Sequence, residues 1–268
     1  MAITTLDGLL AGFQPSNFFE KIGSTMEAIG VLHSLLYTAG IPGAGVAPTS
    51  AIGGDALTSY AGQLPYANPA AGNGYLGRLS VSGTAAGRLL LVDRLWHNAS
   101  ITPTTTTAQT VNSATFPARD ANGSTDGEGV LVGLEVSTAT SNGAPITNTT
   151  MSYTNSGNTA SRTATIASFP ATAVAGTFVP FRLAAGDTGV RSIQSLTLGT
   201  SYGTGVIHLV AFRVLADLHV SLSNVGDAMD AFRLGLPQTY DNTVPTLLWQ
   251  PTGTAAVTLR GLTTYAHG

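Results

Sequence analysis

The sequence predicts a mainly β protein: an antiparallel β-sandwich or jelly roll with an N-terminal helix and a Gly/Pro-rich arm. Short apolar runs recur along residues 75–268, and Gly, Pro and Asn turns separate them. No repeat period is visible, and many short strands with such turns are typical of sandwiches and jelly rolls rather than of parallel α/β sheets. We therefore expect residues 1–74 to form the helix and extended arm, and residues 75–268 to form the β domain.

A helix is predicted over Phe18 to Tyr37. Asn17 and Glu20 form a capping pair at its start, and Gly40 ends it. Apolar residues recur at helical spacing across more than half of its circumference. The residues at this spacing are Phe18, Ile22, Met26, Ile29, His33 and Leu36, of which all but His33 are apolar.

The segment 40–74 is rich in Gly, Pro, Ala and Ser, with a short helix predicted over Ala56 to Gly62. The helix before it can pack on the β domain of its own chain or dock on a neighbouring subunit. The low charge and the long connection favour docking on a neighbour, with this segment as a tether. Deletion of residues 1–40 should then leave a folded β domain.

Strand predictions follow the apolar runs from residue 75 onward. A polar run over 101–111 fits an edge strand or a loop, and 227–234 fits a short helix. Pro180 suggests an edge strand, because proline cannot donate a ladder hydrogen bond. Asn155 to Asn158 should close a hairpin. The predicted strands are 76–81, 88–97, 130–137, 146–153, 161–169, 178–183, 190–198, 205–215, 246–250 and 255–265.

Charged residues make up only 9% of the chain, where roughly 25% is usual for a soluble domain. The net charge of −3 argues against a protein that binds nucleic acid electrostatically. The 43% hydrophobic content argues against a disordered chain, and no apolar run is long enough to span a bilayer. The start, Met1 to Phe13, lacks a basic region, so no secretion signal is expected. The chain has no cysteine, which excludes disulfides, thiol nucleophiles and Cys–zinc sites.

The cations are ten arginines and a single lysine, Lys21. Lysine is depleted and arginine enriched at protein interfaces. A poorly charged surface also repels other subunits weakly, so the composition suits a subunit surrounded by others. A codon bias of a GC-rich genome would explain the arginine preference equally well, but it explains the low total charge less well.

Two catalytic motifs occur in the wrong structural context. Gly72 to Gly77 fits the G-x-G-x-x-G string, but a Pro/Ala loop precedes it and a strand-like run follows it, where a dinucleotide site needs a strand and then a helix. Gly199 to Gly203 fits G-x-S-x-G, but a second strand follows Ser201 where a nucleophile elbow needs a helix. Asp217 and His219 lie only two residues apart, so they do not complete a triad.

Histidines and carboxylates form no recognisable site. Asp93 and His97 share a strand face but are too far apart for a direct pair, and no two histidines have metal-ligand spacing. His33 and His208 lie on apolar faces, as buried structural histidines do. The loop Asp120 to Glu128 alternates oxygen-bearing side chains, a pattern that fits either calcium ligands or an exposed turn. The sequence therefore predicts no catalytic, cofactor-binding or metal-ligating residues.

Three stretches, Met1–Leu9, Ala167–Thr172 and Leu198–Gly203, are similar to virion structural proteins encoded in the head gene cluster of tailed bacteriophages. The resemblance runs along nearly the whole chain and carries no motif of known role. It implies a virion component, assembled in the host cytoplasm, that decorates or cements the capsid. The implied partners are other virion proteins, the major capsid protein first, and copies of the same chain, with a trimer expected. No nucleic-acid or membrane partner is expected.

The sequence-based hypothesis is thus a non-enzymatic capsid-associated subunit without cofactors. A tail or baseplate subunit is one alternative. A carbohydrate-binding module is another, although aromatic residues make up only 7% of the chain and fall mostly within the predicted strands.

Overall fold

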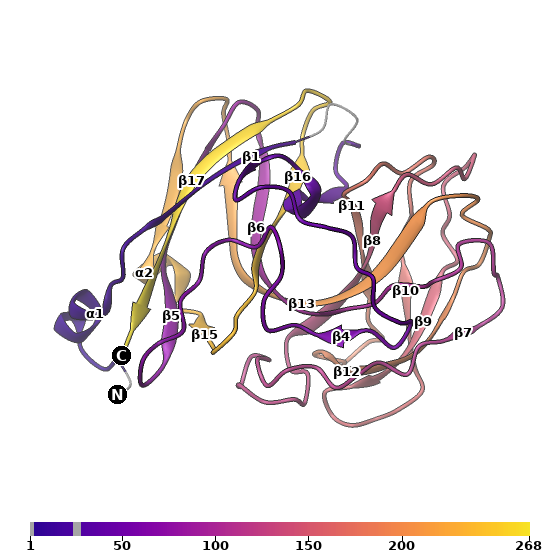
Figure 1. Ribbon diagram of the computed structural model, residues 1–268, viewed down its shortest axis with the longest axis horizontal. Coiled ribbons are helices and arrows are strands. Elements are labelled where there is room, and N and C mark those ends of the chain that lie inside the picture. The colour runs from indigo at the N-terminus through magenta and orange to yellow at the C-terminus, as the bar shows by residue number, and fades with distance from the viewer. Residues whose placement is uncertain (1–2, 24–27) are drawn as a thin grey trace.

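The computed structural model describes residues 3–23 and 28–268, which form two antiparallel sheets (Figure 1). The six-stranded sheet has the order β14-β5-β17-β1-β3, with β15 also paired to β5. Its strands are β1 (Asn17–Ile22), β3 (Gly40–Ile41), β5 (Gly74–Gly83), β14 (Asp227–Asp230), β15 (Gln238–Thr239) and β17 (Thr258–His267). The mainly β, antiparallel fold predicted from the sequence is confirmed.

The eleven-stranded sheet has the order β2-β16-β6-β13-β8-β11-β10-β9-β12-β7, and β4 also pairs with β6. β2 pairs with β11 as well as with β16, so six of these strands close into a ring. Closure removes the sheet edges that would otherwise be left unpaired. The strands are β2 (Leu32–Ser34), β4 (Asp55–Ala56), β6 (Gly87–His97), β7 (Gln109–Thr110), β8 (Val130–Thr138), β9 (Thr150–Asn155), β10 (Arg162–Ile166), β11 (Thr177–Arg182), β12 (Val190–Thr197), β13 (Val206–Val220) and β16 (Pro245–Pro251).

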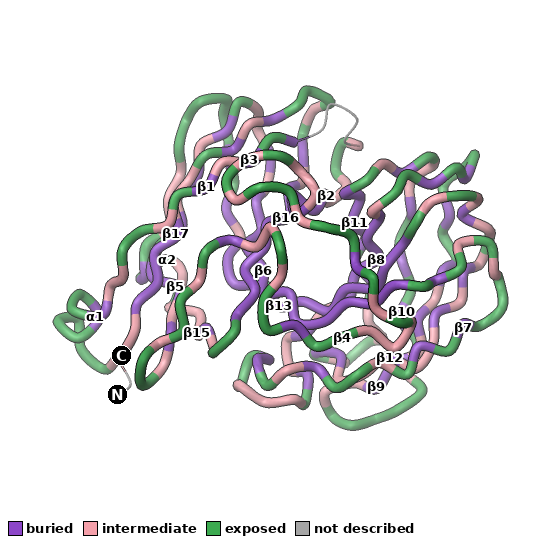
Figure 2. Tube along the Cα trace, in the orientation of Figure 1, coloured by how far each residue is buried: buried purple, intermediate pink, exposed green. Residues whose placement is uncertain are grey.

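Three hydrophobic clusters fill the spaces between these layers. The first lies between the six-stranded sheet and the strands β6, β13 and β16 of the ring. The second lies inside the ring, where Phe178 and Phe212 pack edge to face with centroids 5.2 Å apart. The third and largest lies between β8, β13 and the outer strands β9, β10 and β12. Buried residues therefore run along the central strands, as the purple segments of Figure 2 show.

β6 faces all three clusters, which explains the unbroken apolar run Leu89–Val92 within it. Leu89 and Leu91 face the six-stranded sheet, and Leu90 and Val92 face the ring interior. The register with β13 then shifts between Ala211 and Phe212, with Leu95 as the extra residue. This bulge turns the strand, so that Leu95 and Trp96 enter the third cluster.

The helix predicted over Phe18 to Tyr37 is wrong. The first part is strand β1, and β2 and a short 3-10 helix, η1 (Leu35–Tyr37), form the end. Residues 24–27, including Met26, lie outside the described residues. β1 alternates, with Phe19 and Lys21 buried and Phe18 half exposed, and the buried Lys21 Nζ donates to the carbonyls of Pro42 and Gly43. The alternation of buried and exposed residues in this six-residue strand is not visible in the sequence, because apolar residues lie on both of its faces.

The segment 40–74 is not an extended tether. Leu57 N donates to the carbonyl of Leu95, Leu64 N to that of Pro245, and Trp96 Nε1 to that of Gly53. The accessible surface of 10598 Å² matches the roughly 10,900 Å² expected of a compact monomer of 27.2 kDa. The predicted docking of a helix on a neighbour is wrong, because β1 and β2 pair with strands of their own chain, and residues 56–62 contain no helix. The domain boundary at residue 74 stays a prediction.

Most predicted strands are present, with two local corrections. Pro180 does not mark an edge, because β11 pairs with β8 on one side and with β2 and β10 on the other. On that second side, β2 pairs with residues 177–178 and β10 pairs with residues 181–182. Pro180 lies between these two paired segments, where no partner strand needs a hydrogen bond from its nitrogen. The helix predicted over 227–234 is half strand: β14 comes first, and α2 (Ala231–Leu234) follows it.

Candidate interaction surface

The outer face of the six-stranded sheet is its side away from the ring. The register places Phe18 beside Leu262, and Leu262 beside Ser80, which pairs in turn with Ala228. This row crosses four strands, and Phe18 is 46% exposed. No strand or helix of the described residues covers it, so a large aromatic side chain lies open on a row of small and aliphatic neighbours.

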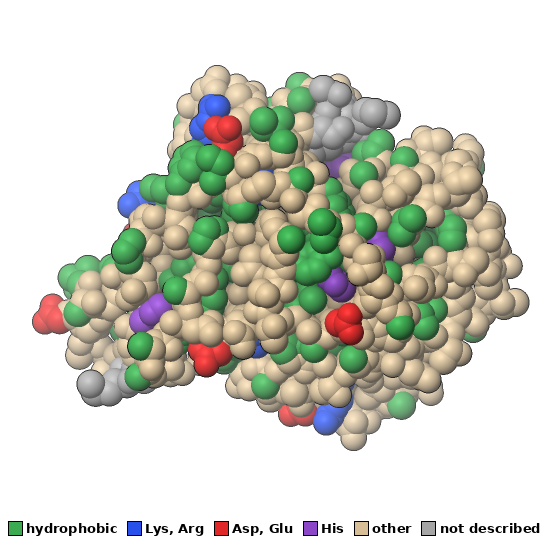
Figure 3. Space-filling model, in the orientation of Figure 1, with side chains coloured by type: hydrophobic (Ala, Val, Ile, Leu, Met, Phe, Trp, Pro, Cys, Tyr) green, Lys and Arg blue, Asp and Glu red, His purple; other side chains and the backbone are tan. Residues whose placement is uncertain are grey.

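The next rows of the outer face are also weakly charged. Ile22 is 45% exposed and Ile41, which is in register with Glu20, is 55% exposed. Between them Arg260 Nε donates to Glu20 across β17 and β1. An exposed ion pair of this kind contributes at most about 1 kcal/mol to stability. Figure 3 shows hydrophobic side chains over β1 and β17 and only scattered charges on this side of the molecule.

One end of the outer face is covered by the two α-helices. α1 (Leu6–Gly12) is capped by the Thr5 hydroxyl, which accepts from Gly8 N at 3.0 Å. Leu9 and Phe13 pack with Ala231 and Ala266 over the sheet. The opposite sides of both helices remain open, since Leu6 is 55% exposed. Leu10 and Phe232 are exposed as well.

A concave region of about 580 Å³ lies where these helices meet the sheet. Phe13 and Gly77 form its floor, because a side chain at position 77 would collide with the Phe13 ring. Arg78 and Asp230, which are cross-strand neighbours on β5 and β14, line its rim. The outer face thus combines open apolar side chains, a hollow and sparse charges of both signs, which are the features of a protein interface.

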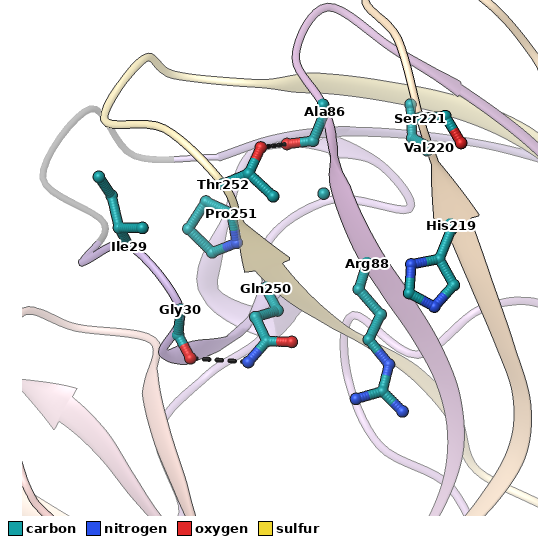
Figure 4. A pocket seen from close by; sticks show the side chains of 11 residues that line it. Ile29, Gly30, Ala86, Arg88, His219, Val220, Ser221, Gln250, Pro251 and Thr252 are labelled. Atoms are coloured by element: carbon teal, nitrogen blue, oxygen red, sulfur yellow. Dashed lines mark hydrogen bonds between the residues drawn. The ribbon is translucent and has the colours of Figure 1, made fainter.

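A second concavity of about 580 Å³ lies beside the ring, between β6, β13 and β16 (Figure 4). Two of its polar side chains are already paired: Gln250 Nε2 donates to the Gly30 carbonyl at 2.7 Å, and Thr252 Oγ1 donates to the Ala86 carbonyl at 2.9 Å. Arg88 is held by the Asp217 carboxylate, with Nε 2.8 Å from Oδ1. The arginine charge is therefore already paired with a carboxylate of the same chain.

The ring interior contains a buried ion pair between β6 and β8. Arg94 and Glu135 are joined by two hydrogen bonds of 2.8 and 2.7 Å, and their side chains are almost completely buried. Burial alone would raise the pKa of Glu135, but the Arg94 guanidinium outweighs it and lowers the pKa to about 2. Tyr37 Oη donates to the same carboxylate at 2.8 Å. η1 thereby fastens the N-terminal segment to the ring.

Two histidines complete this buried cluster. His97 Nδ1 lies 3.2 Å from Arg94 Nε, and its ring packs edge to face on Tyr60. Burial and the nearby Arg94 charge lower the pKa of His97 to about 3. His208 lies between the Asn98 carbonyl, 2.8 Å from Nδ1, and Ser137 Oγ, 2.7 Å from Nε2. Both rings are enclosed and serve as uncharged structural partners.

A second buried ion pair lies next to the first. Arg119 binds the Asp93 carboxylate through Nε and Nη2 at 3.1 and 3.2 Å, and Nη1 donates to the Leu57 carbonyl. Asp93 also accepts from Val244 N at 2.9 Å. Asp93 and His97 therefore have separate partners, as their spacing predicts. The Leu57 contact fixes the segment 40–74 to the body of the protein.

The sequence motifs fall in structural positions. Gly74 of the glycine string begins β5, and no helix follows it. Ser201 lies between β12 and β13, where its Oγ accepts from Gly203 N at 3.1 Å. The prediction that the G-x-S-x-G string is a turn between two strands is therefore confirmed. No cluster of three or more His, Cys, Asp or Glu side chains suited to a metal occurs among residues 3–23 and 28–268.

The loop Asp120 to Glu128 is organised by its own first residue. Asp120 is 1% exposed, and its carboxylate accepts from the backbone N–H groups of Asn122, Ser124, Gly127 and Glu128. Burial would raise the pKa of Asp120, but these donors and the Ser124 hydroxyl lower it. The alternation of oxygen-bearing residues thus reflects a turn closed around one buried carboxylate.

No family model matches the sequence, and no curated protein matches it. Among solved structures, the chain is similar to that of infectious bursal disease virus Gt strain, with 12% identity over 95% of this chain and 81% of the other, at a TM-score of 0.21. The VP2 subviral particle of infectious bursal disease virus gives 11% identity, coverage of 96% and 81%, and a TM-score of 0.20. Similarity at this level carries no argument about function. The resemblance to tailed-bacteriophage proteins stays a prediction.

The sequence pattern did not reveal the buried cluster of Arg94, Glu135 and Tyr37. A signal was present, since Asp93 and Arg94 interrupt the apolar residues of β6 and Glu135 is the single charge in the apolar strand β8. Such charges are buried only when they are paired. The sequence could not show which charges pair, because the partners lie on different strands.

None of the helices of the described residues is long and apolar enough to cross a membrane.

Proposed function

We propose that the protein is a non-enzymatic virion subunit that decorates or cements the capsid, and that its outer face binds the major capsid protein. The observation that carries the proposal is the uncovered row formed by Phe18, Leu262, Ser80 and Ala228. An antiparallel sheet can expose one face to water, but that face is then normally polar. An aromatic residue amid small side chains supports a face that is covered in an assembly.

The size of this face suits a specific interface. The four strands β1, β17, β5 and β14 have 6, 10, 10 and 4 residues, and with about 3.3 Å per residue and 4.8 Å between strands they span roughly 480 Å². The open sides of α1 and α2, with Leu6, Leu10 and Phe232, extend it further. Specific interfaces bury about 800 Å² on each partner, so this face together with the helices is sufficient for one.

The composition supports the same proposal. With 9% charged residues, the surface has little like-charge repulsion to oppose dense packing of subunits. The flanking Arg260–Glu20 pair and the rim residues Arg78 and Asp230 provide charges of both signs, which orient a partner more than they attract it. The sequence resemblance to head-cluster proteins supports a capsid partner. The expected homotrimer belongs to the same proposal.

Copy number in purified particles tests the virion role. Hundreds of copies per particle support a shell position, and a dozen or fewer would support the tail or baseplate alternative. Absence of the protein from washed particles would contradict any virion role.

A surface variant tests the outer face itself. Phe18→Asp should unfold at the same temperature as the parent protein, because Phe18 is half exposed, but should bind to particles roughly 10- to 160-fold more weakly. The factor follows from the loss of about 1.5–3 kcal/mol for one buried aromatic side chain. Val206→Asp, at a 39% exposed position at the start of β13, is the matched control and should load normally. Equal loading of both variants would overturn this choice of surface.

A further inference from the structure

A separate crevice of about 440 Å³ lies on the inner side of the six-stranded sheet, where β17 ends. Its walls are the end of β17, the segment Gln63–Ala67 and the connection from α1 to β1. The lining residues are Gln14, Pro15, Asn17, Gln63, Leu64, Pro65, Tyr66, Ala67, Tyr265 and His267. The volume lies within the range of about 300–1,000 Å³ that is usual for small-molecule sites.

Two side chains in this crevice have buried polar atoms without a partner. Tyr265 is 2% exposed, and its Oη makes no hydrogen bond of ordinary geometry within the part of the chain that the structure describes; the Thr263 hydroxyl, two positions earlier on the same strand face, is unpaired as well. The same is true of His267 Nε2, two positions after Tyr265 on the same strand face. An unpaired buried polar group costs about 1–3 kcal/mol, so two of them in one crevice need an explanation. A ligand that hydrogen bonds to both would supply it.

Three carboxamides add further polar atoms. Gln14 donates through Nε2 to the Gly12 carbonyl, and Asn17 donates through Nδ2 to the Pro65 carbonyl. Gln63 accepts through Oε1 from Tyr60 N. Each amide thus uses one end to hold its own loop. The opposite ends, two oxygens and one NH₂ group, have no partner among the described residues.

The crevice carries no formal charge. No Lys, Arg, Asp or Glu lines it, and burial lowers the pKa of His267, which keeps that ring neutral at pH 7. Tyr66 and Tyr265 pack edge to face with centroids 4.9 Å apart, and Leu64 lies beside them. An uncharged site with aromatic rings and with both donors and acceptors excludes phosphates and metal ions as ligands. It suits a molecule with several hydroxyl groups and an apolar C–H face.

We propose that this crevice binds one neutral sugar residue, with the unpaired Tyr265 Oη and His267 Nε2 as its buried hydrogen-bonding groups. The proposal rests on the geometry of the crevice and is independent of the virion role. A virion subunit with such a site could hold a surface glycan, but the free protein should bind the sugar as well.

Saturation-transfer NMR with the full-length protein tests this inference. Glucose, galactose, mannose and N-acetylglucosamine serve as separate probes. At least one of them should receive saturation from the protein, and its signal should level off as the sugar concentration is raised. Tyr265→Phe and His267→Phe keep the rings and remove one hydrogen-bonding atom each. Each should weaken binding about 2- to 12-fold, the factor that corresponds to one neutral hydrogen bond of 0.5–1.5 kcal/mol.

Tyr202→Phe is the matched control, because Tyr202 is equally buried but its hydroxyl pairs with Thr149 Oγ1 at 2.7 Å, outside the crevice. This variant should bind the sugar as the parent does. The inference is overturned if none of the four sugars receives saturation, or if both crevice variants bind unchanged. A crystal structure grown with the bound sugar, in which only ordered water contacts Tyr265 Oη, would overturn it too.

Discussion

Arg94 of β6 and Glu135 of β8 face each other inside the ring and share two parallel hydrogen bonds of 2.8 and 2.7 Å. The two strands are not neighbours, since β13 lies between them in the sheet. The ion pair therefore spans the interior of the ring, where Tyr37 from η1 reaches the same carboxylate. One buried carboxylate thus connects two strands of the ring and the N-terminal segment.

Glu135→Gln should destabilise the protein by about 3–5 kcal/mol. The substitution leaves the Arg94 charge buried without its counter-charge, and this is the costly way to break a buried ion pair. Urea unfolding followed by tryptophan fluorescence measures the change. Glu20→Gln is the control, because the Glu20–Arg260 pair is exposed and should contribute less than about 1 kcal/mol. Equal effects of the two variants would contradict the stabilising role of the buried pair.

Stability should fall as the pH drops below about 6.5. Burial lowers the pKa of His97 to about 3, so this ring stays neutral in the folded protein while it gains a proton in the unfolded chain. The unfolded state then binds more protons between pH 6.5 and 3, and the free energy of unfolding decreases by up to about 1.4 kcal/mol per pH unit for this histidine. The lowered pKa values of His33 and His208 act in the same direction.

The Glu135 carboxylate adds a second acid-sensitive step. Its folded pKa of about 2 lies below its ordinary value of 4.5, so its stabilisation is present above pH 4.5 and is lost as the pH falls toward 2. Unfolding measured at pH 7.5 and 5.5 isolates the histidine contribution. His97→Gln should reduce the difference between these two pH values, because it removes the buried ring whose lowered pKa produces the difference. An unchanged difference in the His97 variant would refute the assignment.

Deletion of residues 1–40 should abolish cooperative unfolding, in contrast to the expectation from the sequence. β1 lies between β17 and β3 in one sheet, and β2 closes the ring between β16 and β11. The deletion removes both strands and the Tyr37 contact to Glu135. Calorimetry of the truncated chain should show no sharp transition. A truncated chain with a sharp transition near that of the parent would show that these strands are dispensable.

Tyr265→Phe and Tyr202→Phe should change stability in different directions. The Tyr265 hydroxyl is buried without a partner, so its removal should leave stability unchanged or raise it by about 1–3 kcal/mol in the absence of a ligand. Tyr202 shares a hydrogen bond with Thr149, and its loss should cost about 1–3 kcal/mol because the Thr149 hydroxyl is left unpaired. Thermal unfolding of the two variants side by side gives the comparison. Equal destabilisation by both would mean that Tyr265 Oη is paired.

Local sequence determined most strands, because their signals lie within a few residues. β6 and β13 were visible as long apolar runs between turns, and β9 and β10 as two runs around Asn155–Asn158. The turn reading of Ser201 followed from the same local pattern. Apolar alternation and turn residues act at short range, so they need no knowledge of the partner strand.

Tertiary structure decided the rest, and β1 shows why. Asn17 to Ile22 has a helix-like start and apolar residues on both faces, so its own pattern did not separate helix from strand. It became a strand because β17 and β3 pair with it, while Lys21 finds carbonyl acceptors in the turn that follows β3. The buried pair of Arg94 and Glu135, the uncovered row at Phe18 and the crevice at Tyr265 have the same origin. Each joins residues far apart in the chain, and only the packing of the two sheets brings them together or leaves them open.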